Sequence, residues 1–170
     1  MSKIKVVPCS GIGKVLGLMA RETALTVTDR LCPDTAETAC LAHLVTGEDE
    51  AVAKVKGQHC FTVDGCAALC AFKSVEAAGG IVKQQYRAMD EMRFHKGKKP
   101  GTGTALTEEG WQIVDDFAAK IAQDVSELHM GPSATTASGR LREREVFERE
   151  MSATGGKRES AVSKEGINNG

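Results

Sequence analysis

The feature that most constrains the fold is a unit that recurs along the N-terminal half of the chain. In each copy a short apolar run ends at a turn containing glycine, and a segment with helical spacing follows. Residues 3–8 and 59–63 are the first two apolar runs, and residues 81–86 resume as a strand after two glycines. Strands that alternate with helices favour parallel pairing. The sequence therefore predicts an α/β fold with a small open, mainly parallel sheet flanked by helices.

The segments between these strands carry further helix signals. The first helix is expected to begin near Gly11 and to reach as far as Leu31, although the β-branched residues 26–28 weaken the extension. Residues 38–45 fit a short helix, or a strand followed by one, and residues 48–56 fit a short charged helix. A further helix is expected directly after the strand at 59–63, with Cys66 and Cys70 on it.

The C-terminal half divides into a loop, a helix and an extension. Residues 95–104 are rich in Lys, Gly, Pro and Thr, which indicates a linker or a long surface loop. Thr107 is placed to cap a helix that should pack on the sheet through an apolar stripe, formed by Val114, Phe117, Ala118, Ile121, Val125 and Leu128. We thus expect a domain over residues 1–130.

Residues 131–170 form a charged extension with few large apolar side chains. Its one apolar cluster consists of Val146, Phe147 and Met151, so the segment has too little apolar surface to offset the entropy of ordering. We expect the extension to be disordered or to bind a protein partner.

Composition excludes several classes of function. A formal net charge of −1, with one Trp and one Tyr, gives neither the field nor the stacking platforms that nucleic acid binding uses. No stretch approaches the roughly twenty apolar residues that span a membrane, and the N-terminus lacks the apolar core of a signal peptide. We therefore expect a cytoplasmic protein that binds neither nucleic acid nor membrane. Six cysteines in such a protein are expected to be reduced thiols available for metal or redox chemistry, or simply buried as small apolar groups.

The cysteines lie where two strands end. Cys9 follows the first strand, and Cys66 and Cys70 follow the strand at 59–63. Because ligands gather outside the carboxyl ends of parallel strands, the three thiols would share one site if those strands are neighbours. On a helix, Cys66 and Cys70 would lie on one face about 5–6 Å apart, and Cys66 would gain most from the positive helix terminus.

A zinc ion needs four donors, so the other two must come from elsewhere in the chain, and Cys9 and Cys40 are the best candidates. His43 or His59 could replace one thiolate, whereas Cys32 and Cys60 are expected to be packed or surface thiols. Asp64 is expected to cap the start of a helix or to stand behind the metal ligands.

Three separated segments carry a resemblance to a known family. They are Pro8 to Lys14, Cys40 to Ala42, and Asp64 to Ala71, and together they resemble the DGC-domain family, named for the tripeptide Asp64-Gly65-Cys66. The resemblance extends from about Lys3 to Tyr86. It implies a zinc site built from Cys9, Cys40, Cys66 and Cys70, and brings no known reaction with it.

Alternative functions remain open at this point. The cysteines could hold an iron–sulfur cluster in place of zinc. Cys9 or Cys66 could be the low-pKa nucleophile of an enzyme that binds no metal. The protein could also act as an accessory, carrier or assembly protein that engages a partner through its extension. The first turn lacks the residues of a Walker phosphate loop, because Val15 follows Lys14 and Pro8 stands where a glycine is needed.

Overall fold

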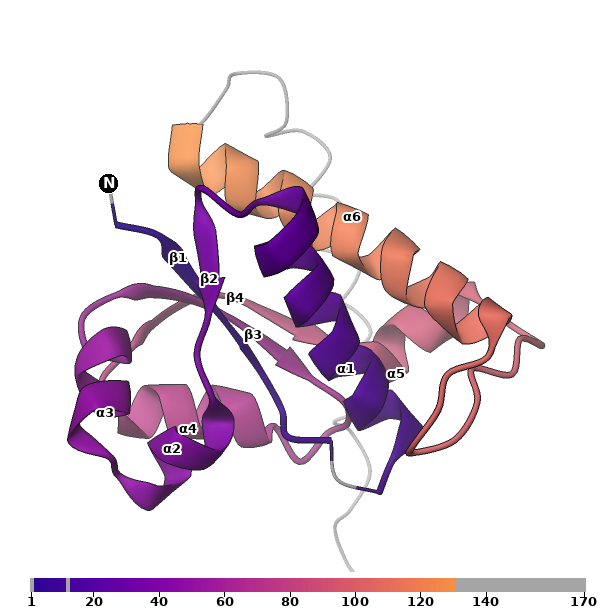
Figure 1. The fold of residues 1–170 in the computed structure, drawn as a ribbon, viewed down its shortest axis with the longest axis horizontal. Coiled ribbons are helices and arrows are strands. Elements are labelled where there is room, and N and C mark those ends of the chain that lie inside the picture. Colours follow the sequence, from indigo (N-terminus) through magenta and orange to yellow (C-terminus); the bar gives the residue numbers. More distant parts are fainter. Residues whose placement is uncertain (1, 12, 131–170) are drawn as a thin grey trace, which may run out of the picture. The chain divides into compact units, whose positions relative to one another are not determined.

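The computed structural model describes residues 2–11 and 13–130 of the chain (Figure 1). Its centre is a parallel sheet of four strands in the order β2-β1-β3-β4. These strands are β1 (Ile4–Pro8), β2 (Ala36–Thr38), β3 (His59–Asp64) and β4 (Ile81–Arg87). The predicted parallel α/β fold is confirmed. The extension at 131–170 lies outside the described residues, so its disorder and its role as a partner-binding segment stay predictions.

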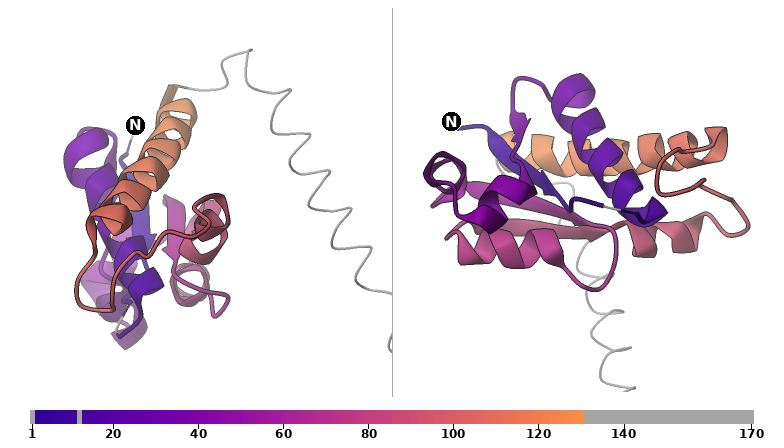
Figure 2. Two further views of the ribbon diagram at one scale, coloured as in Figure 1. Left: turned by 90° about the vertical axis from the view of Figure 1, so that its right-hand side faces the viewer. Right: turned by 60° about the horizontal axis from the view of Figure 1, so that its bottom comes forward.

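Helices cover both faces of the sheet (Figure 2). One face carries α1 (Val15–Leu25) and α6 (Glu108–Met130), and its core includes Met19, Phe61 and Phe117. The Tyr86 ring lies edge-on to Phe61 and Phe117 at centroid distances of 5.8 and 6.1 Å. The other face carries α2 (Leu41–Thr46), α3 (Asp49–Val55) and α4 (Cys70–Ala77), over a smaller core. Within the described ranges no helix is long and apolar enough to cross a membrane.

The first helical segment reaches Leu31 as expected, but its geometry changes on the way. The α-helix begins at Val15, later than predicted, because Gly11 and Gly13 both adopt positive φ and so cannot be helical. Residues Thr26–Leu31 continue it as a π-helix, η1. The hydroxyl of Thr28 donates to the Leu25 carbonyl at 3.4 Å within this stretch. The helix thus continues through the β-branched residues 26–28, with a change from α- to π-helical winding.

The loop before α6 returns to the start of α1. Before this loop the structure contains α5 (Ala88–Glu91) and the 3-10 turn η2 (Met92–Phe94), which were not predicted from the sequence. A Cβ built on Gly103 would stand 2.7 Å from the carbonyl carbon of Gly13, so the two backbones touch. The hydroxyl of Thr107 accepts the N–H of Gly110 at 3.1 Å, which confirms the predicted cap of α6.

Three glycines bring the two strand-to-helix corners into backbone contact. A Cβ on Gly17, in the first turn of α1, would lie 2.2 Å from the Cα of Gly11, in the turn after β1. A Cβ on Gly65, directly after β3, would lie 2.8 Å from the backbone nitrogen of Gly17. Only glycine permits approaches this close. The start of α1 is thereby pressed against the ends of both central strands.

The glycine contact predicts that Gly17→Ala destabilises the protein although alanine is the better helix former. Helix propensity alone would stabilise α1 by about 1 kcal/mol, whereas the added methyl group must displace the backbone of Gly11, at a cost of about 2–3 kcal/mol. Denaturant unfolding should show a net loss of stability. In the control Gly47→Ala the methyl group points into open space and only the positive φ of Gly47 opposes it, so the loss should be about 1 kcal/mol. A more stable Gly17→Ala variant would contradict the contact.

Candidate functional site

The candidate cysteines lie at one edge of the sheet. The chain leaves β1 for β2 on one side and later returns to β3 on the other side of β1, so the connections diverge between β1 and β3. Ligands of open parallel sheets bind at such a point, outside the carboxyl ends of the strands. Cys9 directly follows β1, Cys66 follows β3, and Cys40 follows the neighbouring β2. The strands before Cys9 and Cys66 are neighbours, which is the condition under which the thiols could share one site.

Cys9 is fixed to the end of β3 by two hydrogen bonds. Its N–H donates to the Val63 carbonyl at 2.9 Å, which continues the pairing of β1 with β3 beyond the last residue of β1. Its Sγ accepts the N–H of Gly65 at 3.3 Å. The half-buried Cys9 side chain also packs against the cores on both faces of the sheet. Its sulfur therefore has a defined position between the two corners.

Burial raises the pKa of the Cys9 thiol above its ordinary value of 9.0. The N–H groups of Gly65 and Gly11 lower this pKa in part, because they stabilise a thiolate, and the nearby acidic groups of Asp64 and Cys70 raise it again. Burial therefore favours the neutral thiol of Cys9 over its thiolate. A divalent cation at this position would offset both the burial and the repulsion from Asp64 and Cys70.

The side chain of Asp64, the last residue of β3, caps the start of α4. Its carboxylate, which is 1% exposed, accepts the N–H of Ala71 at 2.8 Å and the N–H of Phe72 at 3.2 Å. Burial raises the pKa of Asp64, while these two hydrogen bonds and the charge of Lys73 lower it in part. Of the two roles expected for Asp64, the structure shows the cap.

The cap corrects the placement of Cys66. The sequence predicts Cys66 and Cys70 on one helical face, but α4 begins only at Cys70. Cys66 lies in a turn closed by a hydrogen bond of 3.4 Å from the Leu69 N–H to the Cys66 carbonyl. The first N–H groups of an α-helix have no partner within the helix. The Asp64 carboxylate accepts the N–H groups of Ala71 and Phe72, so these residues belong to the first turn of a helix that starts near Cys70. Cys70, not Cys66, is therefore the cysteine at the helix N-terminus.

The structure does not gather the four thiols into a finished ligand set. Cys9 and Cys66 are half-buried, whereas Cys40 and Cys70 are exposed. Within residues 2–11 and 13–130, there is no group of three or more His, Cys, Asp or Glu side chains that could hold a metal ion. The assignment of Cys9, Cys40, Cys66 and Cys70 as ligands thus stays a prediction. Cys32 and Cys60 are buried in the core, as expected of packed thiols.

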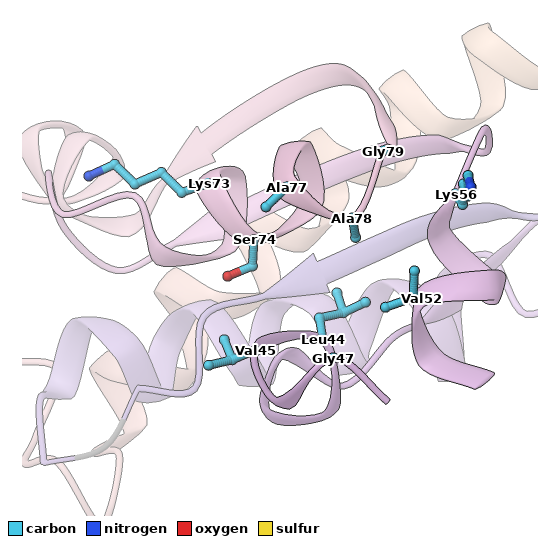
Figure 3. A pocket seen from close by; sticks show the side chains of 10 residues that line it. All are labelled: Leu44, Val45, Gly47, Val52, Lys56, Lys73, Ser74, Ala77, Ala78 and Gly79. Atoms are coloured by element: carbon cyan, nitrogen blue, oxygen red, sulfur yellow. The ribbon is translucent and has the colours of Figure 1, made fainter. Parts of the chain in front are cut away.

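A pocket of about 550 Å³ lies elsewhere, between α2, α3 and α4 (Figure 3). Its walls include Leu44, Val52 and Ala78, with Lys56 and Lys73 among the lining residues, and none of the six cysteines lines it. The polar side chains of its lining are Lys56, Lys73 and Ser74, with no carboxyl, imidazole or thiol group among the lining residues. The chemical interest of the molecule therefore lies at the cysteine edge of the sheet.

Two residues that shape this edge were not predicted from the sequence. Gly17 holds α1 against both corners, and Leu69, directly before Cys70, is the one non-glycine residue with positive φ in the described part of the chain. A glycine inside a helical pattern was the available signal for Gly17, because glycine there costs about 1 kcal/mol and needs a packing reason. Nothing in the sequence marks Leu69, since leucine rarely adopts this conformation.

The fold and the cysteine edge define a small parallel α/β protein whose thiols follow the carboxyl ends of adjacent strands. The model of the DGC domain matches residues 5–115, which is more than half of the chain, and the chain belongs to the DGC-domain family. The match extends beyond the three motifs into the first part of α6. Neither a curated protein nor a solved structure matches the chain.

The cap at α4 predicts that Asp64→Ala destabilises the protein by about 2 kcal/mol, because two N–H groups lose a buried acceptor. Chemical denaturation should show this loss. Asp115, exposed and paired with Arg30 at 3.5 Å, supplies the control, and Asp115→Ala should change stability by less than about 0.5 kcal/mol. Equal effects of the two substitutions would show that Asp64 does not hold α4.

Proposed function

We propose that the protein binds a metal ion through Cys9, Cys40, Cys66 and Cys70, and that zinc is the preferred ion. The observation that carries the proposal is the placement of all four cysteines after the carboxyl ends of three adjacent strands. Thiolates are soft ligands that suit zinc, and the N–H of Gly65 already supports a sulfur at this edge. The donor set therefore fits zinc in its chemistry, and local movement of the exposed thiols would complete it.

The number of thiols favours a structural or carrier role over hydrolysis. Four thiolates fill the tetrahedral coordination of zinc, whereas a catalytic zinc keeps one position open for water. We accordingly propose an accessory, carrier or assembly protein of the cytoplasm, with the extension at 131–170 as its contact with a protein partner. An iron–sulfur cluster would use the same four cysteines, and its visible absorption would distinguish it from zinc.

The raised pKa of Cys9 weighs against the alternative of a metal-free thiol enzyme. A cysteine nucleophile needs its thiolate at neutral pH, and burial opposes that form at Cys9. Cys66 is the other candidate for this role. It is half-buried, and no histidine is joined to it by a hydrogen bond among the residues that the structure describes. Metal binding would use all four thiols, whereas a nucleophilic enzyme would use one of them.

Cys9→Ser and Cys66→Ser should each abolish stoichiometric zinc, because serine is a poor ligand for a soft site. Elemental analysis of anaerobically purified protein measures the loss. Cys32→Ala is the matched control, since Cys32 is buried away from the edge and donates to the Ala122 carbonyl at 3.8 Å. This variant should keep its zinc. Retention of zinc by the Cys66 variant, or equal loss in all three, would overturn the ligand assignment.

Zinc affinity should increase with pH between about 6 and 9, by at most about tenfold per unit for each thiol that zinc deprotonates. The affinity increases with pH because the proton of Cys9 must leave before its sulfur can bind, and burial raises the pKa of this thiol above 9.0. Titration calorimetry in buffers of different ionisation enthalpy should detect the released protons. Affinity that is independent of pH would contradict thiol ligation.

A further inference from the structure

The backbone of Leu69, which lies between the candidate ligands Cys66 and Cys70 in the chain, is strained. Its φ of 56° and ψ of 46° place it in the left-handed helical region, directly before Cys70. For a residue with a Cβ this conformation costs about 1–2 kcal/mol. The residue that precedes a helix is normally Ser, Thr, Asp or Asn in an extended conformation, so Leu69 departs from the rule in both identity and geometry.

The structure holds the chain firmly on both sides of this residue. On one side, Gly65 is pressed against the backbone of Gly17, and its carbonyl accepts the N–H of Met89 at 3.2 Å. On the other side, the Asp64 carboxylate holds the first turn of α4 through Ala71 and Phe72. The span from Cys66 to Leu69 is therefore anchored at each end by contacts that do not depend on the conformation of Leu69.

The span before the Leu69 carbonyl has few contacts of its own. Ala67 and Ala68 are exposed and small, and one hydrogen bond of 3.4 Å, from the Leu69 N–H to the Cys66 carbonyl, closes the turn. The Leu69 carbonyl accepts the Lys73 N–H at 3.0 Å and so belongs to the first turn of α4, which leaves φ of Leu69 as the angle that can change. Cys66 and Cys70 flank it, one half-buried and one exposed. A change of φ at Leu69, with adjustments at Ala67 and Ala68, alters the position of Cys66 relative to Cys70 while α4 and Gly65 stay in place.

We propose that Leu69 is a positioning residue of the metal site, and that its backbone leaves the left-handed region when Cys66 and Cys70 bind one metal ion together. Two sulfurs on one zinc must lie within about 4 Å of each other. The strain is present in the metal-free state and is released in the metal-bound state, so its release adds to the metal affinity. This inference rests on the proposed function.

The test compares Leu69→Gly with Leu69→Ala by zinc competition against a chelator. Glycine adopts the left-handed region without strain, so Leu69→Gly removes the strain from the metal-free state and should weaken zinc binding about 5- to 30-fold. Alanine keeps the Cβ and the strain while removing the rest of the side chain, so Leu69→Ala should bind zinc within about twofold of the wild-type affinity. Unchanged or tighter binding by the glycine variant, or equal weakening in both, would overturn the proposal.

A second measurement needs no variant. Backbone carbon chemical shifts of Leu69 in the wild-type protein report its φ and ψ, and zinc should move them from left-handed values to right-handed or extended ones. Shifts that stay left-handed with zinc bound would refute the role of Leu69 and leave the metal site intact. If the wild-type protein binds no zinc, the proposed function and this inference fail together.

Discussion

The close approach of three backbones at Gly11, Gly17 and Gly65 is the constraint on which the rest of the structure depends. It joins the turn after β1, the first turn of α1 and the turn after β3, with no side chain between them. Because the two turns meet, the N–H of Gly65 reaches the Cys9 sulfur. The same approach sets α1 over the face of the sheet that Phe61 and Phe117 fill. One packing requirement thus determines both the larger core and the geometry around Cys9.

The tripeptide that names the family has a physical reason at each position. Asp64 is the last residue of β3, and its buried carboxylate accepts the first N–H groups of α4. Gly65 leaves room for the start of α1 and donates to Cys9. Cys66 then stands at the carboxyl edge between two anchored segments. The first two residues stabilise the corner, and the third is a half-buried thiol without a disulfide partner in the described part of the chain.

The cysteine edge and the pocket differ in the chemical groups that they contain. The pocket between α2, α3 and α4 is lined by aliphatic side chains, two lysines and Ser74, and it contains none of the cysteines (Figure 3). The edge offers reactive groups on a framework fixed by the glycine contacts. Burial favours the neutral thiol of Cys9, and a cation at this position would compensate for the lost solvation. That property suits a protein that takes up a metal ion better than one that attacks a substrate with a free thiolate.

Local patterns in the sequence determined the parallel sheet, the cap at Thr107 and the apolar stripe of α6. These features follow from periodicity and turn chemistry, which act between residues close in the chain. Tertiary contacts decided where α4 begins, because Asp64 reaches seven residues ahead to Ala71 and leaves Cys66 outside the helix. They also decided the close approach at Gly17, the return of the loop at Gly103 and the left-handed backbone of Leu69. The approach of Gly17 to Gly65 and the return of the loop at Gly103 join segments that are distant in the sequence, and no local pattern records such contacts.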